Sequence, residues 1–379
     1  MRGFCVLVAA LLLSSTYFSA QAVGPAQEII GSYSFENDME GWTGTGVDLE
    51  APGGGGGSIP WSVARSQDIA YDGNTSVRLF MRNDNDGGKV FIEKSFPSEP
   101  DQIYQVHLKY AFASRDTGLV LSQIIAGVLT KSPENGGDMV PAPKEQSNNG
   151  NRNSPSSDYV WLNKSYDFTV RSTQTNLYVV IGIWGTFEVP MQYYLDDVRV
   201  TIAKKPEESE FYSFEDDFDG WTTKAADVEL PNGSSDNWSI ARTSDIWEAG
   251  ATSLRFDLNS LNQNGKIWIE KAFPVEPGRK YNLTLDYAFH AYLNCIPPRF
   301  RIIAGVFRSP PQTADDLAGA IQEKTTDTNC TWGWLHKTYG FTIKSKKSDV
   351  LYIAIGFWGT EKTEGVFNID SVCVTLVPK

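Results

Sequence analysis

The sequence predicts an all-β protein built from two tandem antiparallel β-sandwich domains of the jelly-roll type. Three observations predict this fold: the chain repeats itself, its apolar residues alternate with a period of two, and no segment has the spacing of a long amphipathic helix. The 379 residues are enough for two domains that each bury a core. A hydrophobic content of 41% with 12% aromatic residues favours folded material over disorder.

The chain begins with the pattern of a secretory signal over residues 1–22. Arg2 supplies a positive charge, residues 4–13 form a short apolar run, and residues 20–22 read Ala-Gln-Ala, a small-x-small cleavage site. This run is too short to span a bilayer, and no later run is longer. We therefore expect a secreted, extracellular protein without membrane insertion.

The rest of the chain is one unit written twice. Three pairs of segments show the repeat: 34–42 (SFENDMEGW) with 213–221 (SFEDDFDGW), 61–65 (WSVAR) with 238–242 (WSIAR), and 88–94 (GKVFIEK) with 265–271 (GKIWIEK). The offset between the copies changes only slightly, so insertions fall in loops. We expect domains over 29–203 and 209–379, joined by a charged, proline-marked linker over 204–208.

Strict alternation marks the most regular repeated strand, 177–186 (LYVVIGIWGT), which returns as 351–360 (LYIAIGFWGT). One face is apolar throughout and is expected in the core. The other face combines Trp184 or Trp358 with glycine and small residues, as a shelf for stacking on a flat apolar ring would. The alternative is that these rings cover the edge of the sandwich or pack against a loop.

The net charge of −13 argues against nucleic acid and anionic membranes as partners. Three cysteines remain after the signal. In an oxidising compartment we expect a disulfide between Cys295 and Cys330, which flank an irregular insertion, whereas Cys373 in the last strand is expected to pack as a buried thiol.

The order Phe-Glu-x4-Gly-Trp, Trp-Ser-x-Ala-Arg, Phe-Pro-x-Glu-Pro and a closing Leu/Ile-Asp-x-Val resembles tandem jelly-roll carbohydrate-binding modules of the galactose-binding-like superfamily. The opening and closing motifs also resemble MAM domains, although the cysteines of that family are missing. The resemblance covers almost all of both units and implies a jelly roll that binds glycans.

The resemblance further implies a structural Ca²⁺ where the first and last strands of each unit meet. Carried over by position, its ligands would be Glu36 with Asp196, and Glu215 with Asp370. The alternative is that these acids bond nearby backbone amides or the repeated arginine.

Sugar binding needs rings for stacking and polar groups for hydroxyls. The candidates are Trp184, Trp358, Phe91, Trp268, Tyr71, Trp247, Arg65 and Arg242. The arginines could instead pair with Glu93 or Glu270 across strands. Trp42, Trp221, Trp161 and Trp334 stand beside apolar runs and are interpreted as core residues.

No zinc spacing, nucleophile elbow or phosphate loop is visible, and none of the three histidines is repeated. The sequence therefore predicts a secreted protein, not an enzyme, that binds a polysaccharide or other glycan through two homologous modules. The alternatives are a structural or adhesive extracellular protein that binds other proteins, and a non-catalytic appendage of an enzyme system.

Overall fold

The structure is a computed structural model that describes residues 28–52, 57–85, 87–115, 122–139, 144–146, 159–186, 188, 190–229, 237–248, 250–259, 264–292, 300–324, 334–360 and 364–379. The expected signal segment (1–22) and the expected disulfide partners Cys295 and Cys330 lie outside these residues.

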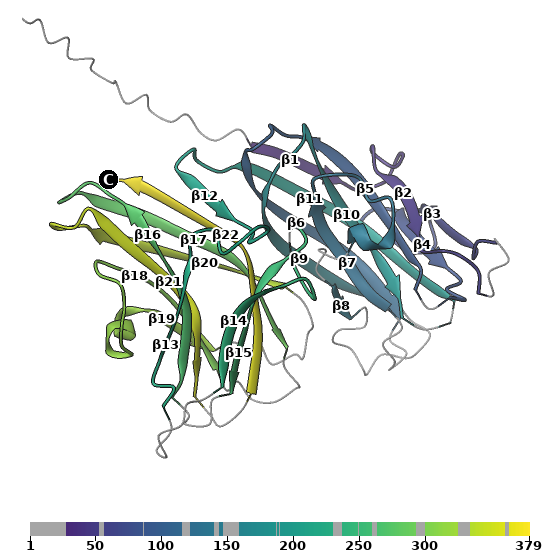
Figure 1. The fold of residues 1–379 in the computed structure, drawn as a ribbon. Coiled ribbons are helices and arrows are strands. Elements are labelled where there is room, and N and C mark those ends of the chain that lie inside the picture. The colour runs from purple at the N-terminus through teal and green to yellow at the C-terminus, as the bar shows by residue number, and fades with distance from the viewer. Residues whose placement is uncertain are drawn as a thin grey trace, which may run out of the picture.

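The first half of the chain forms two antiparallel sheets (Figure 1). Its strands are β1 (Glu28–Tyr33), β2 (Thr43–Val47), β3 (Trp61–Ser66), β4 (Ser76–Met81), β5 (Lys89–Pro97), β6 (Ile103–Arg115), β7 (Ser122–Leu129), β8 (Lys144–Gln146), β9 (Tyr159–Arg171), β10 (Asn176–Gly185) and β11 (Met191–Lys204), with a 3-10 turn η1 (Gly136–Met139). A six-stranded sheet runs β3-β4-β11-β6-β9 with β1 on β11, and a five-stranded sheet runs β2-β5-β10-β7-β8.

The second half repeats this topology strand for strand. It contains β12 (Ser209–Tyr212), β13 (Thr222–Ala226), β14 (Trp238–Thr243), β15 (Ser253–Asn259), β16 (Lys266–Pro274), β17 (Lys280–Tyr292), β18 (Phe300–Phe307), β19 (Ile321–Lys324), β20 (Trp334–Lys344), β21 (Val350–Gly359) and β22 (Glu364–Pro378), with η2 (Asp315–Gly319). The orders are β14-β15-β22-β17-β20 with β12 on β22, and β13-β16-β21-β18-β19. The predicted all-β fold of two sandwiches is confirmed.

Alternation explains the two cores. The expected core positions of β10 and β21 all have 0% exposure: Leu177, Val179, Ile181, Ile183, Leu351, Ile353, Ile355 and Phe357. Each such side chain contributes about 1.5–3 kcal/mol through its burial. The two large clusters contain residues of one half each, so each sandwich has its own core.

The last strand of each sandwich carries a bulge. The pairing of β11 with β6 shifts between Asp196 and Arg199, and that of β22 with β17 shifts between Asp286 and Ala288. At the bulge Asp197 and Ser371 have left-handed backbone, with φ of 46° and 51°. The bulge marks where the strand stops pairing with β4 or β15 and begins pairing with β1 or β12.

The two sandwiches touch through the edge strand β9, which contacts β17, β20 and β22 (Figure 1). Between β11 and β12, Lys205 donates from Nζ to Asp286 Oδ2 at 2.8 Å, and its amide donates to the carbonyl of Ile103 at 2.9 Å. The side chains of Lys205 and Asp286 are only 11% and 5% exposed. The linker is therefore fastened to both halves.

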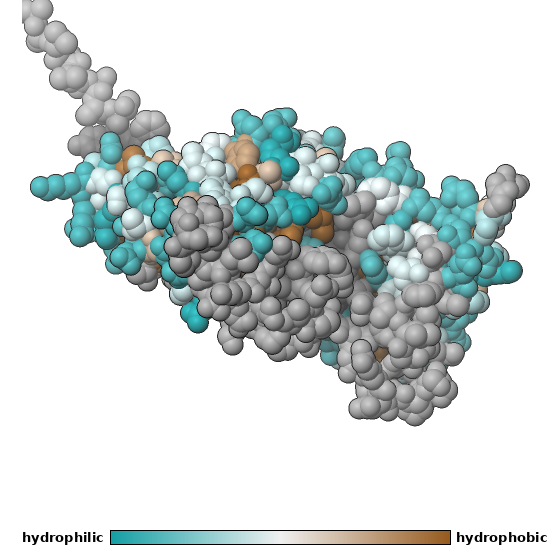
Figure 2. Space-filling model, turned by 60° about the horizontal axis from the view of Figure 1, so that its bottom comes forward, coloured by the Kyte–Doolittle hydropathy of each residue, from teal (hydrophilic) through white to brown (hydrophobic). Residues whose placement is uncertain are grey.

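The visible surface is largely hydrophilic, with small hydrophobic spots (Figure 2). Among the described residues, no helix is long and apolar enough to cross a membrane. Cys373 is a free, buried thiol, as expected, and its burial raises its pKa to about 12.

Replacing Lys205 with Met should lower the free energy of unfolding by about 3–5 kcal/mol, because it leaves the buried Asp286 carboxylate without its cation. The neighbouring Lys204→Met is the control: Lys204 pairs with Glu99, whose side chain is 65% exposed, and its loss should cost at most about 1 kcal/mol. Urea unfolding measures both, and equal losses would contradict a buried junction.

Candidate functional site

The shelf expected around Trp184 and Trp358 is covered. Both rings are half-buried and belong to small apolar clusters on the outer faces of the five-stranded sheets. Lys89 and Lys266 each place Nζ 4.7 Å from the centroid of the tryptophan ring, and Leu317 of η2 packs in the second cluster. These contacts agree with the alternative that the rings pack within the protein, and a role of Trp184 and Trp358 in binding stays a prediction.

Phe91 and Trp268 were expected on an outward face open to ligand. Both are 0% exposed in the same two clusters, Phe91 beside Val180 and Trp268 beside Ala354. Leu317 of η2, which packs in the second cluster, belongs to a long irregular stretch that has no apolar period. A ring buried in this way cannot stack on a sugar, so this prediction is corrected.

Arg65 and Arg242 were expected to bond sugar hydroxyls or a strand glutamate, and the structure shows neither. The Arg65 guanidinium donates to the carbonyls of residues 35, 36 and 37, with 2.6 Å from Nε to Phe35 O. Arg242 makes the same three bonds to residues 214–216. Both guanidinium groups therefore stabilise the turns over residues 35–37 and 214–216.

The acids Glu36 and Asp196 hold the loop over residues 71–75 from its two ends. Glu36 Oε1 accepts from the amides of Asn74 and Thr75, both at 3.0 Å. Asp196 Oδ2 accepts from the amides of Tyr71 at 2.8 Å and Asp72 at 3.2 Å. The amides of Asn74 and Thr75 lower the pKa of Glu36, whereas burial raises that of Asp196. We call this arrangement the carboxylate clamp.

The second half has the same clamp. Glu215 accepts from the amides of Ala251 and Thr252 at 3.0 and 3.2 Å, and Asp370 accepts from that of Glu248 at 2.8 Å. No group of three or more His, Cys, Asp or Glu side chains among the described residues could hold a metal ion. The four carboxylates accept backbone amide hydrogens, as the alternative expects, and the calcium sites that the resemblance implies stay a prediction.

The clamp places Tyr71 at the rim of the six-stranded sheet. Its side chain is 43% exposed, and its ring contacts Trp161 edge-on at 5.6 Å between centroids. Trp161 was expected in the core. Instead it lies opposite Ala113, the neighbour in sequence of the core residue Phe112, so it points to the outer face and is half-buried.

The outer face of the six-stranded sheet is a continuous aromatic and polar surface. One row across the strands reads Ala64, Arg78, Tyr194, Ala113 and Trp161, each residue directly opposite the next. Phe80 and Tyr159 lie two positions along their strands, on the same face. We call Tyr71, Phe80, Tyr159, Trp161 and Tyr194 the aromatic face.

Polar groups lie among these rings. The Tyr194 hydroxyl donates to Asp68 Oδ2 at 3.0 Å and accepts from Gln192 Nε2 at 2.5 Å. Burial, followed by the bond to Asp68, raises the pKa of Tyr194 well above its usual value. Arg78 Nη1 lies 3.9 Å from the same Asp68 carboxylate. The face thus offers a carboxylate, a guanidinium and an amide beside the exposed ring of Tyr71 and the half-buried rings of Phe80, Tyr159 and Trp161, whereas the Tyr194 ring is buried beneath them.

The same face of the second half is filled differently. Its corresponding row reads Ala241, Arg255, Asn368, His290 and Trp334. Asn368, His290 and Trp334 are 4%, 6% and 7% exposed, and the indole N–H of Trp334 donates to the Trp247 carbonyl at 3.0 Å. Trp247 itself is half-buried. The two halves thus have the same strand order, but different side chains lie on the outer face of their six-stranded sheets.

Beside this row lies a buried polar cluster of Glu248, His336 and Ser371. The Ser371 hydroxyl donates to Glu248 Oε2, and His336 Nε2 lies 3.6 Å from Glu248 Oε1. Burial raises the pKa of Glu248 to about 7 and lowers that of His336 to about 4. Both groups therefore favour their neutral forms inside the protein.

Comparison with known proteins finds mainly β-sandwich carbohydrate-binding modules among solved structures. The tandem CBM22-1–CBM22-2 domain of Paenibacillus barcinonensis Xyn10C has 16% identity and a TM-score of 0.32, covering 94% of this chain and 100% of that one. The K1 cleaved adhesin domain of Lys-gingipain from Porphyromonas gingivalis W83 has 13% identity and a TM-score of 0.29, covering 44% and 96%. The mannan-recognising module TmCBM27 has 14% identity and a TM-score of 0.29, covering 48% and 100%.

No protein-family model matches the sequence, and no curated protein matches it. Because all three TM-scores lie below 0.5, we derive the function from the residues of this chain alone.

The buried Glu248 gives a pH-dependent prediction. Its folded-state pKa of about 7 lies above the usual glutamate value of 4.5, so the cost of ionising the buried carboxyl is absent below pH 4.5 and complete above pH 7. Glu248→Gln removes that cost. Relative to wild type, its free energy of unfolding should rise by about 3 kcal/mol between pH 4 and pH 8.

Urea unfolding across this pH range measures the difference. Glu99→Gln, at a side chain that is 65% exposed, is the matched control and should follow wild type. A Glu248→Gln curve parallel to wild type would contradict a buried carboxyl with a raised pKa.

Proposed function

We propose that this is a secreted, non-catalytic glycan-binding protein whose ligand lies on the aromatic face of the first sandwich. The single observation that carries the proposal is the edge contact of exposed Tyr71 with half-buried Trp161, 5.6 Å between ring centroids, on the outer side of the six-stranded sheet where Arg78 also lies. Flat rings can stack on the C–H face of a sugar, while a few fixed polar groups bond its hydroxyls.

The polar groups of the face suit a neutral or weakly charged partner. Arg78 lies near the Asp68 carboxylate, so the one cation of the row has a counter-charge within the protein. Asp68, Arg78 and Gln192 together supply acceptors and donors, which is what hydroxyls require because they do both. The net charge of −13 disfavours a polyanionic ligand.

Catalysis is not part of the proposal. Glycoside hydrolysis uses two carboxyl groups on opposite sides of the bond. Of the carboxylates beside the aromatic rings, Asp196 accepts from three amides, those of Tyr71, Asp72 and Asp197, and Asp68 accepts from the Tyr194 hydroxyl. Binding without reaction is the chemistry that this surface supports.

We propose one aromatic-face site per chain, not two. The second half has Asn368 and His290 in place of Tyr194 and Ala113, and its Trp334 is buried. The two copies have thus diverged at the positions that would touch the ligand.

Trp161→Ala should weaken binding to a polysaccharide by more than about tenfold, because losing a central ring of a binding surface typically costs 2 kcal/mol or more. Xylan and mannan are suitable first probes, since modules named above or related to them bind these polymers, followed by a wider glycan array. Affinity electrophoresis gives the ratio of affinities.

Trp61→Ala is the matched control, because Trp61 is 37% exposed but lies outside the aromatic face. It should bind as wild type does. A folded Trp161→Ala protein with unchanged affinity would move the site elsewhere, and a folded wild type that binds no glycan would overturn the proposal.

Binding should not depend on calcium, because the clamp carboxylates that the resemblance implicates are occupied by backbone amides. The affinity measured in excess EDTA should equal that in millimolar CaCl₂. A loss of affinity with EDTA, restored by calcium, would show that the clamp rearranges around a metal ion.

A further inference from the structure

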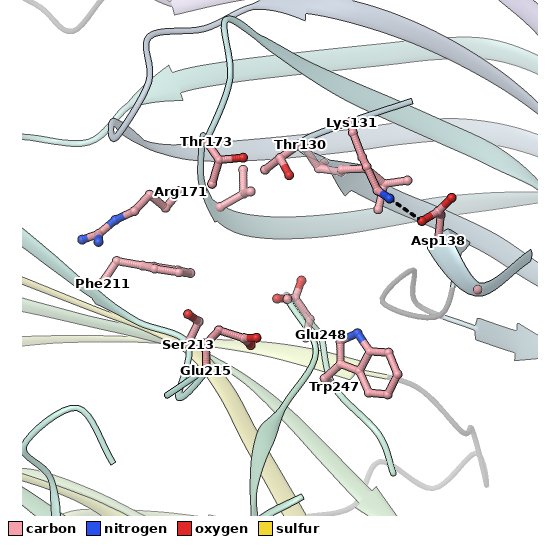
Figure 3. Close-up of a pocket in the computed structure, with 15 residues that line it drawn as sticks. Thr130, Lys131, Asp138, Arg171, Thr173, Phe211, Ser213, Glu215, Trp247 and Glu248 are labelled. Carbon is pink, nitrogen blue, oxygen red and sulfur yellow. Dashed lines mark ion pairs between the residues drawn. The ribbon is translucent and has the colours of Figure 1, made fainter. Parts of the chain in front are cut away.

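A cavity of about 450 Å³ lies between the two sandwiches (Figure 3). One wall comes from the first half, around the end of β7, η1 and the end of β9, and the other from β12 and the clamp loop of the second half. Its volume lies in the range of about 300–1,000 Å³ typical of small-molecule sites. The cavity is not repeated within the chain, because the first half contributes a different part of its sandwich to the walls than the second half does.

The charged groups of the walls already have partners in the protein. Lys131 donates to Asp138 at 2.7 Å, and the Arg171 guanidinium lies over the Phe211 ring at 5.7 Å. Glu215 is bonded to the clamp amides, and Glu248 to Ser371. Lys131 and Asp138 neutralise each other, and the walls carry one further cation, Arg171, and one further anion, Glu215, so neither charge is in excess and the walls favour a neutral ligand.

Other wall groups suit hydroxyls. Thr130 and Thr173 lie on the first wall and Ser213 on the second, and none of the three makes a side-chain hydrogen bond to another described residue. A hydroxyl both donates and accepts. The half-buried indole of Trp247 lines the same cavity and adds a flat apolar surface. These three hydroxyls could bond the hydroxyls of a sugar residue, and the Trp247 ring could stack on its apolar face.

We propose that this cavity, which we call the junction pocket, is a second carbohydrate site that holds a neutral mono- or disaccharide unit against Trp247. The inference rests on the proposed glycan-binding function and adds a site that neither sandwich forms alone. The aromatic face takes the flat side of a longer chain, and the junction pocket takes a short unit. Lys205 bonds both halves close in sequence to Phe211, which lines the second wall.

The test isolates the junction pocket by removing the other site. In a Trp161→Ala background, saturation-transfer NMR with xylobiose, mannobiose, cellobiose and lactose detects what the pocket binds. Thr173→Trp adds a bulky ring at an exposed position of the pocket wall and should reduce the signal at least tenfold. Thr175→Trp, two residues along the same exposed segment but outside the pocket, should leave it unchanged.

Each outcome has one meaning. A disaccharide signal that survives Trp161→Ala and Thr175→Trp but is lost with Thr173→Trp supports the junction pocket. No signal in the Trp161→Ala background, or one that Thr173→Trp leaves intact, overturns the pocket while polysaccharide binding by the wild type stands. A wild type that binds no glycan overturns both proposals.

Discussion

The carboxylate clamp is the constraint on which the rest of each sandwich depends. Glu36 and Asp196 belong to the turn after the first strand and to the last strand, and both accept amide hydrogens of one short loop. Thr75 extends the tie by donating to the Phe35 carbonyl at 2.7 Å. Hydrogen bonds to a carboxylate are worth more than neutral ones, so a few of them fix three distant segments together.

The clamp also accommodates strain. Phe35 and Phe214 have left-handed backbone with φ of 57° and 59°, an unfavourable conformation for a bulky residue, costing about 1–3 kcal/mol. The repeated arginine bonds the carbonyl of that residue, and Gly73 and Gly250, with φ of +68° and +78°, let the loop approach the glutamate. A Cβ at either glycine would meet the glutamate carboxylate. The repeated Phe-Glu and Trp-Ser-x-Ala-Arg motifs therefore encode a joint between segments.

The sequence was sufficient to predict the fold because period-two alternation and repetition act over short distances. It also predicted the buried Cys373 and the faces of β10 and β21 that form the cores. It could not show that Leu317 of η2 packs against the outer face of the second five-stranded sheet, because that segment lacks an apolar period. Trp268 was therefore misread as an open surface.

Trp161 was missed for the opposite reason. It stands beside apolar residues in sequence, which favours the core, but its side depends on its pairing with Ala113. The signal that could have found it was the small residue on the neighbouring strand: the core positions Tyr110 and Phe112 alternate with Ala111 and Ala113. These two alanines are buried, and their small side chains leave room on the outer side of the central strand for the rings of the neighbouring strands.

The carboxylate clamp also explains how the two halves can carry different side chains in the clamp loop. Because the clamp needs only backbone amides, the loop side chains are free to change, and the residue whose amide bonds the last-strand aspartate is Tyr71 in one half and Glu248 in the other. In the first half that position extends an exposed aromatic surface. In the second it turns inward to Ser371 and His336 and lines the junction between the sandwiches. One joint, used twice, thus supports an outer face in the first half and part of an interdomain cavity in the second.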